Sequence, residues 1–294
     1  MGEEILLAER FEAERPQLRS VAYRMLGSVA EAEDAVQEAW LKMSRTDVTG
    51  VRNLGAWLTT VVGRVCLDQL RSRTSRREDP LPEQDGQVRL PDPVVSGLST
   101  LDPVNEILVA DSVGIALMVV LETLAPAERL AFVLHDMFDV PFDEIAPVLG
   151  RTGASTRQLA SRARRRVQGA TPAADADTAR KREVVDAFLT ASRGGDFEAL
   201  LAVLDPEVVA RSDGGTLVPS VLRRGAAEVA AQAITFARFA ADGRPVLVNG
   251  SPGVVSFAGG RALSVMSFTI HDGRITALDI LTDPTRLAAL GLTG

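Results

Sequence analysis

Apolar residues recur three and four positions apart in three stretches of the first 77 residues. The stretches are FEAERPQLRSVAYRMLG, EAEDAVQEAWLKMSR and NLGAWLTTVVGRVCLDQLRSR, with breaks near Gly27 and Gly50. Such spacing places the apolar side chains on one face of an α-helix. We therefore expect a helical domain over residues 1–77.

Residues 78–103 interrupt this pattern with five prolines and two glycines. Because proline has no backbone N–H and blocks a helix interior, the segment is predicted to be a linker. Helical periodicity returns over residues 104–169, in VNEILVADSVGIALMVVLETL, PAERLAFVLHDMF, PFDEIAPVLG and ASTRQLASRARRRV. A second linker is expected at residues 170–178, in ATPAADADT.

The pattern changes class over residues 179–294. Three helical stretches, RKREVVDAFLTAS, DFEALLAVL and AAEVAAQAITFARFA, are joined by runs that read as strands: EVVA, RPVLVNG, PGVVSFAGG, RALSVMSFTIHDG and RITALDIL. Asp272-Gly273 is a hairpin signal. The sequence therefore predicts a multidomain chain with two all-α domains followed by an α+β domain, whose sheet we expect to be antiparallel.

Charge changes the picture because it is unevenly placed. The whole chain has a formal net charge of −7, yet residues 145–170 hold six arginines and residues 70–77 hold four, with no Asp or Glu in either segment. An acidic chain is repelled by phosphates at long range, so any nucleic-acid contact must be local. The two arginine-rich segments are the candidates for that contact.

The second arginine-rich segment follows a helix-turn-helix pattern. At about 100° per residue, Thr156, Leu159, Ala160, Ala163 and Val167 share one side of a helix, and polar residues fill the other. PFDEIAPVLG and RTGAS supply the preceding helix and turn. A basic face can be merely solvated, but a face without acids favours DNA binding. The predicted DNA-binding residues are Ser155, Thr156, Arg157, Gln158, Ser161, Arg162, Arg164 and Arg165.

Both helical domains resemble the bacterial extracytoplasmic-function (ECF) sigma factors, through EAEDAVQEAWLKM, NLGAWLTTVVGRVCLDQLRSR and STRQLASRARRRV. The resemblance implies a region 2 bundle that binds core RNA polymerase and the minus-ten element, and a region 4 that reads the minus-thirty-five element. Implied polymerase contacts are Asp34, Gln37, Glu38, Trp40 and Leu41, and implied region 2 DNA contacts are Trp57, Arg64, Gln69, Arg71 and Arg73. Either tryptophan could instead be a core residue.

The C-terminal extension, residues 179–294, resembles the SnoaL-like domain, of the nuclear-transport-factor-2-like cone fold, found in one ECF subgroup. Three short motifs of that subgroup have counterparts: a linker motif (residues 90–93), a DGG turn (residues 213–215) and a C-terminal motif (residues 283–287). The resemblance implies regulation in cis, with the extension packed on the linker. Its implied regulatory residues are Leu90, Pro91, Asp92, Pro93, Asp213, Gly214, Gly215, Asp283, Pro284 and Leu287.

Several classes of function are disfavoured by composition. With one cysteine and two histidines, neither a disulfide nor a transition-metal centre is expected, and we expect no cofactor. Candidate acid–base groups in the extension are Asp213, His271, Asp279 and Asp283, but their spacing shows no catalytic pair. No apolar run is long enough to cross a bilayer, so we expect a soluble cytoplasmic protein without membrane contact.

The expected partners follow from the resemblance. They are core RNA polymerase, double-stranded promoter DNA and the melted non-template strand, and we expect no separate anti-sigma factor because the fused domain can supply control. Two other interpretations remain open: a helix-turn-helix repressor with a ligand-sensing domain, and a SnoaL-type enzyme tethered to DNA. A repressor would not need residues 31–43 and 53–73, and an enzyme would need a polar pocket.

Overall fold

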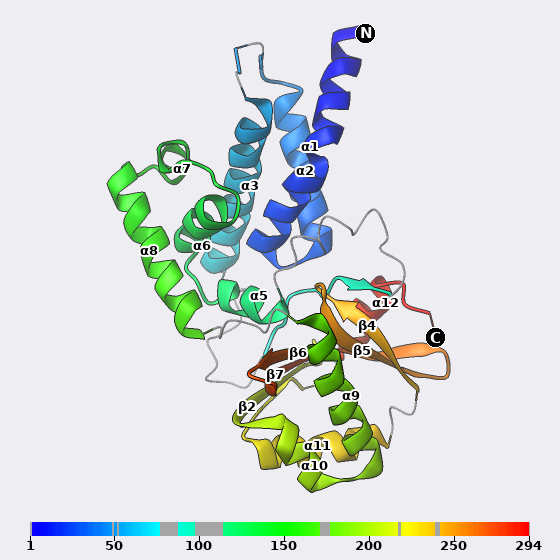
Figure 1. Ribbon diagram of the computed structural model, residues 1–294. Coiled ribbons are helices and arrows are strands. Elements are labelled where there is room, and N and C mark those ends of the chain that lie inside the picture. The colour runs from blue at the N-terminus through cyan, green and yellow to red at the C-terminus, as the bar shows by residue number, and fades with distance from the viewer. Residues whose placement is uncertain are drawn as a thin grey trace. The chain divides into compact units, whose positions relative to one another are not determined.

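The computed structural model describes residues 2–48, 50–51, 53–76, 88–97, 114–170, 177–216, 219–238 and 242–293 (Figure 1). The chain divides into two compact units, Met1–Asp79 with Met118–Ala170, and Pro80–Leu117 with Thr171–Gly294. Predictions for residues 78–87 and 98–113, which include most of the first linker, lie outside the described residues. No helix in the described part of the chain is long and apolar enough to cross a membrane.

Three helices form the first bundle, as predicted: α1 (Gly2–Leu26), α2 (Val29–Met43) and α3 (Leu54–Arg76). Their apolar faces meet at fully buried side chains such as Leu18, Met43 and Leu67. Cys66 is buried in the same core, and burial raises the pKa of its thiol. The cysteine is therefore a core residue rather than a reactive group.

The remaining helices of this unit begin with α5 (Ile115–Glu122), whose first residues belong to the other unit. Then follow α6 (Pro126–Phe132), a π-helical turn η2 (Val133–Met137), α7 (Phe142–Leu149) and α8 (Gly153–Ala170). Gly150 ends α7 in the left-handed conformation, with φ of 63°. A glycine accepts this conformation without strain, so the chain can turn sharply into α8 and complete the predicted helix-turn-helix.

The second unit is built on a seven-stranded sheet with the order β1-β4-β5-β6-β7-β2-β3. Its strands are β1 (Val95–Ser96), β2 (Leu204–Asp213), β3 (Val221–Arg224), β4 (Asp242–Val248), β5 (Ser251–Ala258), β6 (Arg261–His271) and β7 (Arg274–Leu281). Its helices are α9 (Thr178–Gly194), α10 (Phe197–Val203), α11 (Ala226–Ala237) and α12 (Pro284–Ala289). This is the predicted α+β domain.

Helices α9, α10 and α11 lie together against the sheet (Figure 1) and share one apolar core with it. Phe188 of α9 meets Phe268 of β6 edge to face, with ring centroids 5.5 Å apart. The predicted Asp272-Gly273 hairpin is confirmed: both residues have positive φ, 50° and 73°, and they join the paired residues His271 and Arg274. Positive φ at both central positions is the type I′ geometry.

Two features of the sheet differ from the sequence prediction. The expectation of a purely antiparallel sheet was wrong, because β2 and β7 run parallel, with Arg211 beside Asp279. Parallel neighbours need a long crossover, which local turn signals do not reveal. The linker also contributes a strand, because Val95 and Ser96 pair with Val248 and Leu247 at the edge of β4.

Candidate nucleic-acid interface

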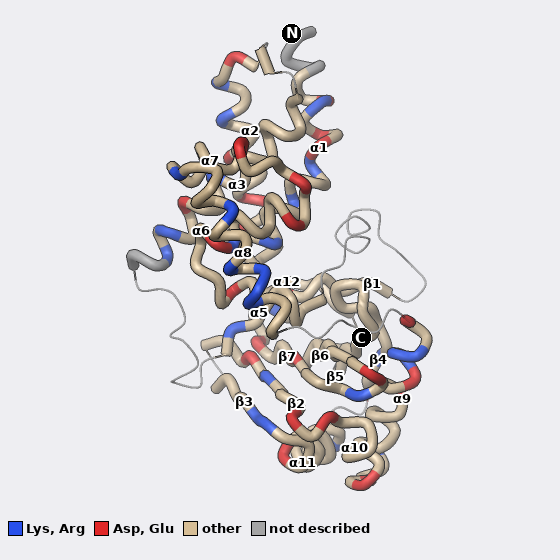
Figure 2. Tube along the Cα trace, turned by 60° about the vertical axis from the view of Figure 1, so that its left-hand side comes forward, with Lys and Arg blue, Asp and Glu red and all other residues tan. Residues whose placement is uncertain are grey.

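Helix α8 buries one side and exposes the other, as its sequence predicts. Leu159, Ala160 and Ala163 are buried, and Arg157, Gln158 and Arg165 are exposed. Thr156 is a correction to the predicted DNA-binding set: its side chain is fully buried and its Oγ1 donates to the Thr152 carbonyl at 3.0 Å. It sits on the apolar side of α8 and holds the first turn. Figure 2 shows the basic residues along this helix.

Helices α8 and α3 each have some arginines paired with acids and others exposed. On α8, Arg166 donates to Glu128 at 3.2 Å and Arg164 donates through Nε to Asp136 at 2.8 Å. On α3, Arg64 and Arg71 are exposed, and Arg73 forms an ion pair with Glu31. Acids from neighbouring helices thus neutralise part of each basic surface, which the run of arginines alone did not reveal.

The predicted region 2 contacts fall on two faces of α3. Trp57, Arg64 and Arg71 are each seven residues apart, about two turns, and so share one face. Gln69 and Arg73 lie roughly 140–180° away from the two exposed arginines. They line a groove of about 470 Å³ between α2 and α3, together with Glu31, Asp34, Glu38, Val65, Asp68 and Ser72.

Helix α2 has an exposed face, and part of that face lines this groove. Asp34, Gln37, Glu38 and Leu41 are exposed and fall within a sector about 100° wide. Leu41 is 46% exposed and adds an apolar side chain to this otherwise polar face. Trp40 points elsewhere, with its ring 5.1 Å from the ring of Phe11. The structure therefore groups four of the five predicted polymerase contacts and places Trp40 partly in the bundle core.

The first bundle and the helix-turn-helix pack against each other through α3. A Cβ built on Gly63 of α3 would lie 3.0 Å from Leu130 and 3.1 Å from Leu134, so the absent side chain permits this approach. Arg129 of α6, which is 3% exposed, donates through Nε to the Arg24 carbonyl of α1 at 3.0 Å. Burial lowers the pKa of Arg129 to about 10. The Nη2 of this buried guanidinium has no hydrogen-bond partner among the described residues, which weakens the contact.

In the second unit, the three short motifs meet at Arg286. Its guanidinium donates to Asp92 of the linker motif at 2.7 Å, to Asp213 of the DGG turn at 2.6 Å and to the Leu90 carbonyl at 2.6 Å. Burial alone would lower the pKa of Arg286, but the two carboxylates outweigh it and raise that pKa. Sequence reasoning did not select Arg286, although a cation in one motif facing acids in the other two was a usable signal.

The DGG turn and the C-terminal motif also contact each other directly, because the Asp283 amide donates to the Asp213 carbonyl at 3.1 Å. Gly215 has φ of 67°, and a Cβ there would lie within 2.0 Å of Asp283, so a side chain is excluded on both counts. Asp283 is the N-cap of α12, accepting from the amides of Thr285 and Arg286, and Pro284 is the first helical residue. Pro284 is exposed and Leu287 is buried. Gly214 is buried beside Asp213.

Asn249 is a second contact residue that the sequence did not single out. The side-chain oxygen of Asn249 accepts from the backbone amide of Val94 at 2.9 Å. The backbone amide of Asn249 donates to the Val94 carbonyl at 2.8 Å. It also forms the β4–β5 turn with φ of 48°. The linker is therefore held at both ends of residues 90–94, by Asp213 through the Leu90 amide at 2.7 Å and by Asn249.

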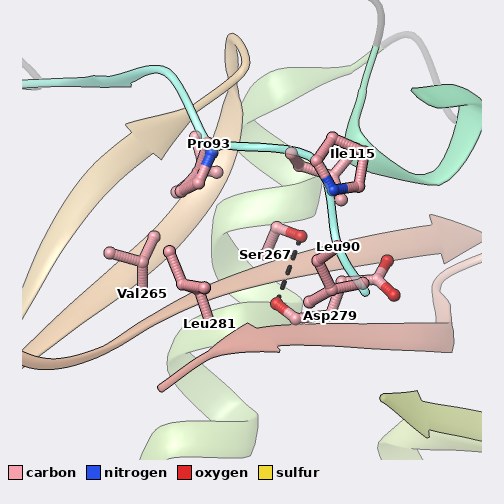
Figure 3. A pocket seen from close by; sticks show the side chains of 9 residues that line it. Leu90, Pro93, Ile115, Val265, Ser267, Asp279 and Leu281 are labelled. Atoms are coloured by element: carbon pink, nitrogen blue, oxygen red, sulfur yellow. Dashed lines mark hydrogen bonds between the residues drawn. The ribbon is translucent and has the colours of Figure 1, made fainter. Parts of the chain in front are cut away.

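Between these two holds, the linker motif covers a small cavity of about 10 Å³ (Figure 3). Leu90, Pro91 and Pro93 form one wall, and Ile115, Val248, Val265, Ser267, Asp279 and Leu281 complete the lining. This is room for about one water molecule. Asp279 is buried, with one oxygen 3.1 Å from Arg211 and the other without a hydrogen-bond partner among the described residues. The other acid–base candidates have different positions. His271 lies at the end of the β6–β7 hairpin, Asp213 accepts from Arg286, and Asp283 caps α12.

We expect Asp279 to make this unit less stable as pH rises. Burial raises the pKa of Asp279, and the nearby Arg211 opposes this only in part. Between the ordinary value of 3.8 and the raised value, the folded protein binds more protons than the unfolded chain. The free energy of unfolding should therefore fall over that window relative to Asp279→Asn, measured by urea unfolding from pH 4 upwards. A constant difference between the two proteins would contradict this.

Comparison with known proteins adds an independent finding. The family models of Sigma-70 region 2 and of Sigma-70, region 4 match residues 10–76 and 115–167. The chain is 41% identical over 292 residues to the ECF RNA polymerase sigma factor SigJ of Mycobacterium tuberculosis, covering 94% of this chain and 91% of that protein. It is 35% identical to the probable ECF RNA polymerase sigma factor SigI of the same species, covering 95% and 94%.

The same relative matches in structure. The crystal structure of Mycobacterium tuberculosis SigJ superposes with a TM-score of 0.77 at 37% sequence identity, covering 96% of this chain and 98% of that one. The similarity thus extends over the two helical parts and the α+β part together. It is much too extensive to reflect a shared helix-turn-helix alone.

Proposed function

Because the chain belongs to the ECF sigma factors, a family of promoter-specificity subunits of RNA polymerase, we propose roles in transcription initiation for its individual surfaces. The observation that carries the assignment is similarity over both sigma regions and the C-terminal part in one alignment. It favours a sigma factor over a repressor, which would share only the helix-turn-helix.

The exposed faces divide among the partners. We assign Asp34, Gln37, Glu38 and Leu41 to core polymerase, because an acidic face with an exposed leucine suits a basic, partly apolar surface. Arg64 and Arg71, with Trp57 on the same face, suit the melted non-template strand. Arg73 would reach DNA only after leaving Glu31, and with Gln69 it ranks behind the first three. We propose domain limits of 1–77, 104–169 and 179–294, as predicted from the sequence.

The packing of the two helical parts implies a conformational step before promoter binding. The two promoter elements are named for positions about 25 base pairs apart, roughly 85 Å along B-DNA. Here α3 contacts α6, and α6 contacts α8, so the axes of the two DNA-binding helices are at most about 20 Å apart where they pack. A single molecule therefore grips both elements only after α3 separates from α6.

For the C-terminal domain we propose regulation in cis rather than catalysis. The linker motif lies over Asp279, and the space beside this carboxylate is about 10 Å³, room for about one water molecule. What supports regulation is that the linker between the two sigma regions is held by Arg286, Asp213 and Asn249 of this domain. Control supplied in this way makes a separate anti-sigma factor unnecessary, and the site of action is the cytoplasm, where RNA polymerase works.

Run-off transcription with purified core polymerase tests this function. We expect the full chain to direct initiation from its promoter, and a chain ending at Gly169 to initiate with an altered yield because its linker is no longer held. Arg64→Ala and Arg71→Ala should each reduce open-complex formation, while Arg45→Ala, an exposed arginine after α2, should not. Failure of the full chain to bind core polymerase would refute the assignment.

A further inference from the structure

Helix α8 carries five arginines, and three of them face acids of the same helical unit. One oxygen of Glu128 on α6 accepts from Arg166 at 3.2 Å, and the other lies 3.6 Å from Arg162. Asp136 of η2 accepts from Arg164. Arg157 and Arg165 make no ion pair with an acid in the part of the chain that the structure describes.

The geometry of α8 explains this division. At about 100° per residue, Arg157, Arg165 and Gln158 fall within one 100° sector opposite the buried side. Arg162 and Arg166 flank that sector on one edge, where Glu128 lies, and Arg164 flanks it on the other, where Asp136 lies. The acids therefore hold the helix from both flanks and leave the central sector open.

The acids are the constrained partners in these pairs. The side chain of Glu128 is 9% exposed and that of Asp136 is 17% exposed, whereas the three arginines are 43–58% exposed. Exposed ion pairs contribute little to stability. Glu128 is nearly buried, so its carboxylate has little freedom to turn towards water and keeps its arginines over α6; Asp136 is held less tightly.

We propose that Glu128 and Asp136 are positioning residues of the DNA-reading helix. They withhold Arg162, Arg164 and Arg166 from phosphates and fix the orientation in which Arg157, Gln158 and Arg165 meet the minus-thirty-five element. The consequence is that general affinity for DNA is kept low while the sequence-reading sector is held still. This inference rests on the proposed DNA-binding role of α8.

The salt dependence of binding provides the test, because each phosphate contact contributes about 0.9 to the slope of log K against log salt. The full chain is titrated onto a labelled duplex of scrambled sequence between 50 and 200 mM salt, with fluorescence anisotropy as the readout. Glu128→Gln frees two arginines and should steepen the slope by about 1.8, so that affinity falls about tenfold more over this range. Asp136→Asn should steepen it by about 0.9.

Single arginine variants separate this idea from a merely structural role. Arg165→Ala and Arg157→Ala should flatten the slope by about 0.9 each, whereas Arg162→Ala and Arg166→Ala should leave it nearly unchanged in the wild-type background. Arg166→Ala added to Glu128→Gln should remove about half of the steepening. If Arg162→Ala and Arg166→Ala flatten the wild-type slope as much as Arg165→Ala does, the proposal is wrong.

Glu144→Gln is the matched control, because Glu144 is an exposed acid of α7 and has no arginine partner in the described residues. The substitution makes the same change in charge within the helix-turn-helix. Equal steepening by Glu144→Gln and Glu128→Gln would assign the effect to the overall field and overturn the proposal. Should Glu128→Gln fail to fold, Asp136→Asn decides alone. A wild-type chain with no measurable slope would instead refute the DNA-binding role itself.

Discussion

Replacement of Arg286 by methionine is expected to release the linker from the C-terminal domain. The substitution leaves the buried carboxylate of Asp213 without its cation and removes the hydrogen bonds to Asp92 and the Leu90 carbonyl. Breaking a largely buried ion pair in this way costs about 2–4 kcal/mol. Hydrogen exchange at the amides of Leu90 and Val94 should accelerate about 30-fold or more, as a loss of 2 kcal/mol implies.

Two companion variants make the result interpretable. Arg286→Lys keeps the charge but lacks the planar guanidinium that binds two carboxylates and a carbonyl at once. We therefore expect hydrogen exchange to accelerate by an intermediate amount. Arg244→Met removes an exposed arginine of β4 in the same domain and should change stability by less than about 1 kcal/mol. Unchanged exchange at Leu90 in Arg286→Met would show that the linker is held by other contacts. Run-off transcription with the same variants then measures what the released linker does to promoter output.

A leucine at position 63 is expected to separate the first bundle from the helix-turn-helix. Even a Cβ at Gly63 would touch Leu130 and Leu134 at about 3 Å, and overpacking of this kind costs about 1–3 kcal/mol. Opening the contact relieves the overlap while each helical part stays folded. We expect the open fraction to rise about tenfold, a shift of 1.4 kcal/mol. Gly63→Ala should have a smaller effect in the same direction.

The opening can be measured as the distance between two spin labels, attached to cysteines that replace Gln37 of α2 and Gln158 of α8. Both positions are exposed. Cys66 is buried and would stay unlabelled. Gly169→Leu is the control, because nothing lies within 4 Å of a Cβ at that helical glycine. A distance distribution that is the same in Gly63→Leu and wild type would exclude a steric latch at α3. If the open form is the one that binds promoters, Gly63→Leu should also raise initiation at limiting core polymerase.

Local patterns predicted most of the elements and only part of the site. The period of apolar residues on α8 predicted which side would be buried, and Asp272-Gly273 predicted its hairpin, because both depend on neighbours in sequence. The same pattern could not show that Glu128 and Asp136 would neutralise three of the arginines, since those acids lie on other helices. It also could not separate Arg64 and Arg71 from Arg73, whose partner Glu31 is on α2.

The sequence by itself determined the class and order of the domains, the helix-turn-helix and the family, because periodicity, turn residues and short motifs are local properties. Only the tertiary structure decided which residues of distant segments meet. Arg286 contacts Asp92 and Asp213, which lie 194 and 73 positions earlier in the chain, respectively. Strand β2 lies parallel to β7, and the missing side chain at Gly63 leaves room for Leu130 and Leu134. Such contacts depend on how the chain folds back on itself, and in one sequence an arginine that pairs with a buried acid looks the same as one that is free to bind DNA.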